Sequence, residues 1–223
     1  MFKTGNSSID YLLIVIIFLP LLPALLIFGR KLYLQEPLNF LLIVCLLSFF
    51  RGLLELTYPL TRENQYVINK IFSLILLLLL VPCFRPHLNA RYRHILDILL
   101  SALLTLAITY WSLMDWERPS PGIDALLNVF LGMLILVSSP MVIRTGSLQI
   151  FKSPLFWIGS GTLFYILLYL LLEGIGSCCR PLTSPPDPEK RLFLLLADLV
   201  KYSFYLIAAI STKPSSPALP RTQ

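Results

Sequence analysis

The stretch RLFLLLADLVKYSFYLIAAIST (residues 191–212) decides the fold class, because it is an apolar run of membrane-spanning length that contains two opposite charges. A helix of about 20 apolar residues crosses a hydrocarbon core of roughly 30 Å. Asp198 and Lys201 lie in the middle of this run, where burying a charge costs about 2.5–3.5 kcal/mol on insertion scales. We therefore expect a transmembrane helix whose charges belong to a polar cluster inside a helix bundle.

The composition of the whole chain is that of a membrane protein. Its 223 residues are 57% hydrophobic and 13% charged, with a mean hydropathy of +0.78, whereas soluble domains have about 25% charged residues. The expected fold class is all-α, a polytopic bundle of seven transmembrane helices, and the first helix is expected to kink at Pro20 and Pro23. These helices are expected near residues 11–29, 38–58, 66–84, 95–114, 124–143, 154–174 and 192–212, followed by a disordered cytoplasmic tail at 213–223.

The distribution of Lys and Arg predicts the orientation of the bundle. With the N-terminus outside, the inner loops and the tail hold nine basic residues against one acid, Glu36, while the outer segments hold six basic and seven acidic residues. Cytoplasmic loops carry an excess of Lys and Arg, so the expected topology is N-out and C-in. The net charge of +6 is then explained by topology, and no nucleic-acid partner is expected.

The inner loop RPHLNARYRH (85–94) holds both histidines of the chain. His87 and His94 lack the neighbouring thiolates or carboxylates that a metal site needs, so neither a metal nor another cofactor is expected. Arg85, Arg91 and Arg93 are interpreted in two ways. They contact anionic lipid headgroups at the inner face, or they dock a cytoplasmic partner. Asp97, just inside the next helix, is expected to pair with Arg93.

Two charged pairs lie inside apolar helices, and both have helical spacing. Arg51 and Glu55 are four residues apart, and Asp198 and Lys201 are three apart, so each pair shares one helix face. At 1.5 Å per residue, the first pair lies roughly 5–11 Å and the second roughly 9–14 Å below the outer surface. The resulting outer polar layer is expected to comprise Arg51, Glu55, Lys70, Asn128, Tyr165, Tyr169, Asp198, Lys201 and Tyr202.

Two interpretations of this outer polar layer remain open. It is either a buried ion network that fixes helix register, or a ligand-binding site that opens outward. If the helices at 38–58 and 192–212 share one charged layer, they must be neighbours, with Arg51 or Glu55 within salt-bridge reach of Asp198 or Lys201. Otherwise each pair neutralises itself within its own helix. Small residues in two other helices, Gly132 and GSG at 159–161, are expected to let helix backbones approach closely.

The sixth helix carries a Pro-x-Phe-Trp-Ile-x-x-Gly-x-x-x-Tyr pattern. Its residues are Pro154, Phe156, Trp157, Ile158, Gly161 and Tyr165. Together with the seventh helix and an acid late in the second, Glu55, this pattern resembles short stand-alone bacterial seven-transmembrane-helix proteins. Those proteins are similar to the membrane-sensor module of sensor histidine kinases. The resemblance implies a multi-pass protein of the bacterial inner membrane, with a sensor histidine kinase as a partner.

These observations lead to an ordered set of functional hypotheses. No nucleophile, metal set or phosphate-binding loop is evident, so the chain is not expected to be an enzyme. The first hypothesis is a receptor-like sensor or signalling subunit without its own catalytic output domain, which binds an unknown small ligand in the outer polar layer. The alternative is a small-molecule transporter, because intramembrane charges also line substrate paths. Transport requires polar residues in the inner half as well, and the sequence has few there.

Overall fold

The computed structural model describes residues 7–57, 61–143, 150–179 and 188–212, and every regular element within these ranges is a helix. Three of the elements are single 3-10 turns, at Leu32–Leu34, Arg85–His87 and Ile150–Lys152. The α-helices are α1 (Ser7–Phe18), α2 (Leu21–Gly29), α3 (Leu38–Thr57), α4 (Arg62–Phe84), α5 (Ala90–Met114), α6 (Pro121–Ile143), α7 (Pro154–Cys179) and α8 (Pro188–Ser211).

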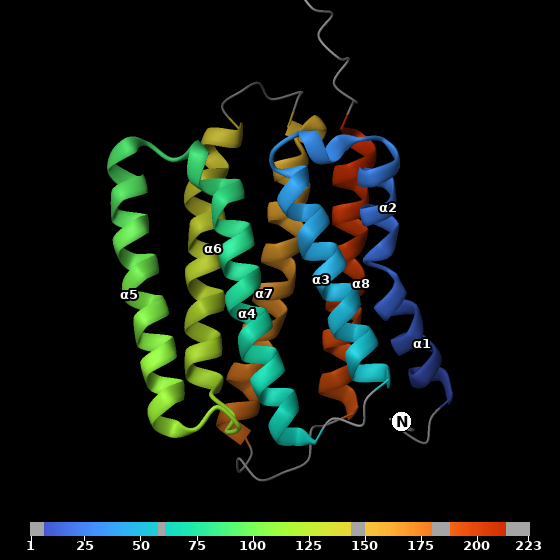
Figure 1. The fold of residues 1–223 in the computed structure, drawn as a ribbon, viewed down its shortest axis with the longest axis vertical. Coiled ribbons are helices and arrows are strands. Elements are labelled where there is room, and N and C mark those ends of the chain that lie inside the picture. Colours follow the sequence, from blue (N-terminus) through green and yellow to red (C-terminus); the bar gives the residue numbers. More distant parts are fainter. Residues whose placement is uncertain (1–6, 58–60, 144–149, 180–187, 213–223) are drawn as a thin grey trace, which may run out of the picture.

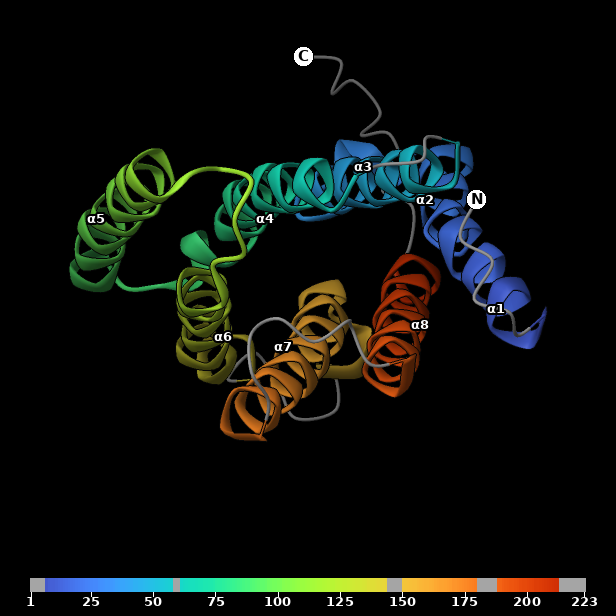
Figure 2. The same ribbon diagram turned by 90° about the horizontal axis from the view of Figure 1, so that it is seen from below.

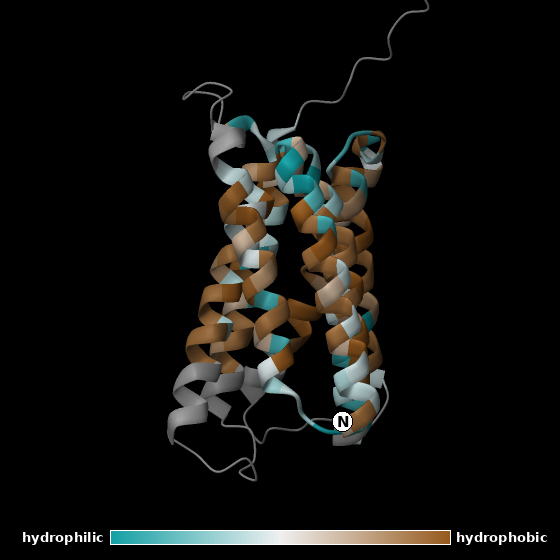
Figure 3. Cartoon of the chain, turned by 90° about the vertical axis from the view of Figure 1, so that its left-hand side faces the viewer, coloured by the Kyte–Doolittle hydropathy of each residue, from teal (hydrophilic) through white to brown (hydrophobic). Residues whose placement is uncertain are grey.

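Within the described ranges the helices form seven segments that are long and apolar enough to cross a membrane. This confirms the expected all-helical class and the expected number of such helices. Figure 3 shows apolar residues along the middle of the helices, with hydrophilic residues concentrated toward their ends. The expected tail at 213–223 lies outside the described residues.

Four helices begin at a proline or directly after a capping residue, and not at the first residue of the apolar run. Pro121, Pro154 and Pro188 each occupy the first helical position, where the missing N–H costs no hydrogen bond. At α4 the Thr61 side chain accepts from the Asn64 N–H, 3.4 Å away. Three helices therefore begin three to four residues before the expected starts at 66, 124 and 192, since hydropathy does not register a polar first turn.

The first apolar segment is interrupted as its prolines predict. α1 ends at Phe18 and α2 begins at Leu21, with Pro20 preceding it. A proline removes one backbone hydrogen bond and clashes with the preceding turn. The expected kink is confirmed as a break at Pro20, while Pro23 lies within the first turn of α2 and is buried.

The region 85–94 is not a loop throughout, which corrects the expectation from sequence. Asn89 precedes α5, which already begins at Ala90. Arg91, Arg93 and His94 therefore lie on the first helical turns of α5. The physical reason is that the helix continues beyond its apolar part, and a hydropathy pattern starts only at the first apolar residues.

The α-helices pack as an elongated bundle with two sides (Figure 1). Seen along the helices, α3 and α4 form one side, and α6, α7 and α8 form the other. α5 lies at one edge beyond α4 and α6, and α1 and α2 lie at the opposite edge (Figure 2). We call the end near the start of α1 the N-terminal end, and the end at which α8 stops the C-terminal end.

Of the described glycines, Gly161 has the tightest surroundings, at the contact between α7 and α8. A Cβ atom on Gly161 would lie 2.7 Å from Cβ of Phe204 and 3.1 Å from the carbonyl oxygen of Lys201. A Cβ on Gly159 would lie 3.1 Å from Ile135 of α6, and one on Gly132 would lie 3.6 Å from Ile166 of α7. The expected close contacts at GSG are confirmed, whereas a Cβ on Gly132 would make only ordinary van der Waals contact.

Candidate functional site

The first charged pair predicted from sequence forms an ion pair on α3. The Arg51 Nε atom donates to Glu55 Oε1 at 3.1 Å, and the two side chains are 35% and 27% exposed. The guanidinium also lies 5.9 Å from the ring centroid of Phe72 on α4. The i,i+4 spacing brings the pair together, and Phe72 places a cation–π partner above the arginine.

The second pair lies on α8 and is enclosed by aromatic rings. The Lys201 Nζ atom donates to Asp198 Oδ1 at 2.5 Å. Its ammonium lies 4.1 Å from the ring centroid of Tyr165 on α7 and 4.6 Å from that of Tyr202. Lys201 is only 12% exposed and Asp198 is 28% exposed. A carboxylate and two ring faces therefore replace the water that the ammonium would otherwise bind.

The two pairs lie on different helices, and among the described residues no salt bridge joins them. Arg51 is within electrostatic range of Asp198 and of Tyr165. The ion pairs of the described residues within this layer are nevertheless Arg51–Glu55 and Lys201–Asp198, each inside one helix. The predicted salt bridge between the second and seventh transmembrane helices is therefore wrong. Helical spacing satisfies each charge locally, and a side-chain hydrogen bond between Ser48 and Tyr202 connects α3 to α8 instead.

We use the name α3–α8 cluster for Arg51, Glu55, Tyr165, Asp198, Lys201 and Tyr202. Sequence reasoning missed polar groups that extend this cluster toward the C-terminal end. The buried hydroxyls of Thr162 and Tyr205 lie 2.9 Å apart and share a hydrogen bond. Tyr205 is four residues after Lys201, so the helical spacing was a signal that could have identified it. The next turns, Ile158 and Ala208, are fully buried and apolar.

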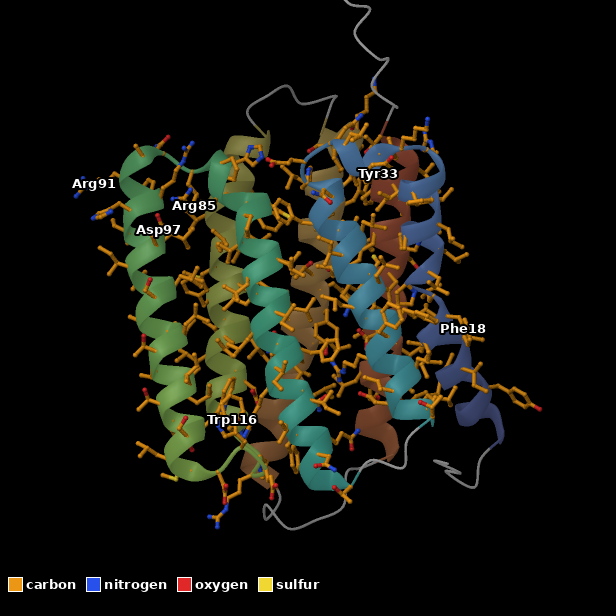
Figure 4. The ribbon with its side chains drawn as sticks, viewed as in Figure 1. Phe18, Tyr33, Arg85, Arg91, Asp97 and Trp116 are labelled. Carbon is orange, nitrogen blue, oxygen red and sulfur yellow. The ribbon has the colours of Figure 1, made fainter. Side chains whose placement is uncertain are left out.

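Lys70 contacts the connection between α5 and α6, and not the charged pairs of the predicted outer polar layer. It is 2% exposed, and its ammonium donates to the carbonyl oxygens of Trp116 at 2.9 Å and Arg118 at 2.7 Å. Those residues lie in the connection between α5 and α6, at the N-terminal end of the bundle, where Figure 4 labels Trp116. Lys70 therefore fixes this connection to α4, and we remove it from the candidate ligand-binding residues.

Two further residues of the outer polar layer have contacts of their own. The Asn128 Nδ2 atom donates to the Asp124 carbonyl at 2.8 Å, one turn earlier on α6. Tyr169 stacks on Tyr165, with ring centroids 6.4 Å apart. Tyr169 thus adjoins the α3–α8 cluster, whereas no described contact joins Asn128 to it.

Of the three arginines near the C-terminal end, two are hydrogen-bonded within the protein and one points away from it. Arg85 forms a two-hydrogen-bond ion pair with Asp97, at 2.9 and 2.7 Å. The expected Asp97–Arg93 pair is therefore wrong, because Arg93 donates to the carbonyls of Leu88 and Pro86 instead. Arg91 is exposed and points away from the bundle in Figure 4. Of the three arginines, Arg91 is the one best presented to a lipid or protein.

Arg30, to which the sequence assigned no functional role, connects the end of α2 to the end of α8. The Arg30 Nη1 atom, just after α2, donates to the carbonyl oxygens of Ala209 at 2.9 Å and Ile210 at 3.2 Å. These are among the last carbonyls of α8, which lack partners within the helix. A cation also interacts favourably with the negative end of a helix dipole. Arg30 therefore caps the helix that carries Asp198 and Lys201.

No family model, curated protein or solved structure matches the chain. The class of protein defined by fold and site is thus an all-helical bundle with seven helices of membrane-spanning length and apolarity, holding a charged and aromatic cluster between α3, α7 and α8. Chemically, the cluster offers one guanidinium, one ammonium, two carboxylates and two phenols, which suit binding of a polar or charged group.

Proposed function

We propose that this chain is a multi-pass protein of the bacterial inner membrane that acts as a receptor-like sensor or signalling subunit. Its orientation is N-out and C-in, as the excess of Lys and Arg at the C-terminal end of the bundle supports. The α3–α8 cluster then lies in the outer half of the membrane. A ligand bound there changes how α8 packs on α7 and α3.

The convergence of polar groups from three helices in an apolar bundle is the observation that carries this proposal. Charges inside a membrane are costly and generally serve function. Arg51, Glu55 and Asp198 keep 35%, 27% and 28% of their side-chain surface exposed. A binding site must leave such groups accessible to its ligand, and the partial exposure of these three side chains meets that requirement.

Transport of a small molecule is the alternative, and one contact favours it. The Thr162–Tyr205 hydrogen bond continues the polar groups one turn beyond Lys201. A transport path must reach the opposite end, yet Ile158, Ala208 and Ala209 are 0% exposed directly beyond that pair. The polar region therefore stops inside the bundle, which supports a receptor over a transporter.

The signalling partner is proposed to be a cytoplasmic protein, such as a sensor histidine kinase, docked near Arg91. The test is co-purification from membranes in mild detergent with the wild type and with Arg91→Glu. The docked protein should be lost from the variant while the thermal stability of the bundle is unchanged. Arg93→Glu is unsuitable, because Arg93 holds the carbonyls of Leu88 and Pro86. A protein retained by Arg91→Glu, or no co-purifying protein, contradicts this docking site.

A further inference from the structure

A groove at the C-terminal end of the bundle is separate from the α3–α8 cluster. It lies between α3, α4 and α5 and has a volume of about 430 Å³, within the usual range of small-molecule sites. Its apolar lining includes Phe40, Leu78, Val81, Pro82 and Leu100. Pro82 lies inside α4, where it removes a backbone hydrogen bond from the helix.

The charged residues of the groove gather at one end of it. Arg85 and Asp97 face each other between α4 and α5 (Figure 4), and Glu36 lies just before α3. Glu36 and Arg85 adjoin helix ends and Asp97 lies about two turns inside α5, while Leu78 and Leu100 lie further along the helices toward the middle of the bundle. The groove is therefore polar at membrane-surface level and apolar below, which matches an amphiphile aligned with the helices.

The charges at the rim identify the kind of headgroup that fits. Two carboxylates and one guanidinium line the groove, a net charge of −1 when all are ionised. Arg93 donates a hydrogen bond to the carbonyl of the lining residue Pro86, and including its charge brings the net charge of the rim to zero. A headgroup with net negative charge gains nothing from such a rim, whereas one carrying both an anion and a cation fits it.

We infer that this groove binds a phospholipid with a zwitterionic, primary-ammonium headgroup, of the phosphatidylethanolamine type. Asp97 occupies Nε and Nη2 of Arg85, which leaves Nη1 for a phosphate oxygen. Glu36 is exposed and accepts the ammonium. An acyl chain follows the apolar residues of α4 and α5. This inference requires only that the bundle spans a membrane and does not depend on a receptor role.

The test compares lipids with identical acyl chains on delipidated protein by native mass spectrometry. We expect phosphatidylethanolamine to be retained about two- to fivefold better than phosphatidylglycerol or phosphatidylcholine. Phosphatidylglycerol is anionic overall, and phosphatidylcholine has no N–H to donate. Glu36→Gln should reduce this ratio to about one. The matched control Glu117→Gln, in the connection between α5 and α6 at the other end, should leave it unchanged.

A second variant separates the acyl-chain site from the headgroup site. Leu78→Trp fills the groove and should weaken retention of all three lipids without changing their order. Equal or better retention of phosphatidylglycerol, or a preference that survives Glu36→Gln, would overturn the inference.

Discussion

The ammonium of Lys201 on α8 lies over the ring of Tyr165 on α7, 4.1 Å from its centroid. This contact joins two helices one turn from Gly161, where a Cβ would lie only 2.7 Å from Phe204 of α8. Lys201 is thus held by Asp198 along its own helix and by an aromatic ring across the interface. A ligand that takes the place of the Tyr165 ring would remove a contact between α8 and α7.

Removal of the lysine should expose the cost of an unpaired buried charge. Lys201→Met leaves Asp198 without its partner. Breaking a fully buried pair typically costs about 3–5 kcal/mol, and the 28% exposure of Asp198 sets the expected loss below that range. The double variant Lys201→Met/Asp198→Asn should recover much of the loss, because the ion pair is confined to α8. Reversible unfolding in detergent or bicelles measures both.

Glu55→Gln provides the matched control for that double variant. It removes a carboxylate of the same cluster that pairs with Arg51 instead. Rescue of Lys201→Met by Glu55→Gln but not by Asp198→Asn would contradict the local pairing.

Gly161→Ala should separate α7 from α8. The added methyl would lie 2.7 Å from Phe204 Cβ and 3.1 Å from the Lys201 carbonyl, and overpacking of this kind costs about 1–3 kcal/mol. Gly122→Ala is the control, because a Cβ there meets nothing within 4 Å. Its effect should stay within about 0.5 kcal/mol. Equal thermal stability of the two variants would refute the close approach.

Loss of the Arg30 cap should loosen the end of α8. Arg30→Gln removes the cation that binds the Ala209 and Ile210 carbonyls, an interaction worth about 0.3–1 kcal/mol. Hydrogen exchange should speed up in the last turns of α8 and remain unchanged around Lys201. Lys31→Gln, the next position, should have no such effect. Unchanged exchange in Arg30→Gln would show that the cap contributes nothing.

Reporter fusions test the orientation. Alkaline phosphatase is active only outside the cytoplasm, so a fusion after Thr212 should be inactive and an insertion near Pro119 should be active. This follows from the distribution of Lys and Arg along the chain. The reverse pattern would invert the assignment of every connection.

The sequence predicted how deep each polar residue lies along its helix better than it predicted which way the side chain points around the helix. A rise of 1.5 Å per residue placed Arg51 and Lys201 at similar depth, and the structure brings their surroundings together. Depth does not say which way a side chain points around its helix. Lys70 therefore appeared to belong to the same layer, although it faces the connection between α5 and α6.

The apolar runs likewise predict the number of long helices, but they do not predict the polar turns at which those helices begin. Hydropathy places Arg91 and Arg93 in a loop because it has no signal for a charged first turn, whereas both lie on α5. The pairing of Arg85 with Asp97 depends on how α4 and α5 face each other, which no spacing within one helix reveals.

The most direct test of the proposed receptor site is its accessibility to water from each side of the membrane. Tyr165→Cys is prepared with the four native cysteines, Cys45, Cys83, Cys178 and Cys179, replaced by serine. A membrane-impermeant thiol reagent is then applied to the outer face, and separately to inverted vesicles. Ala209→Cys, buried beyond the polar region, is the control.

An outward-opening, closed-ended site predicts labelling of Cys at position 165 from the outer face only, with position 209 unlabelled from that face. Labelling of position 165 from both faces would indicate a transport path. No labelling from either face would show that the α3–α8 cluster is a sealed ion network, and would contradict the receptor proposal.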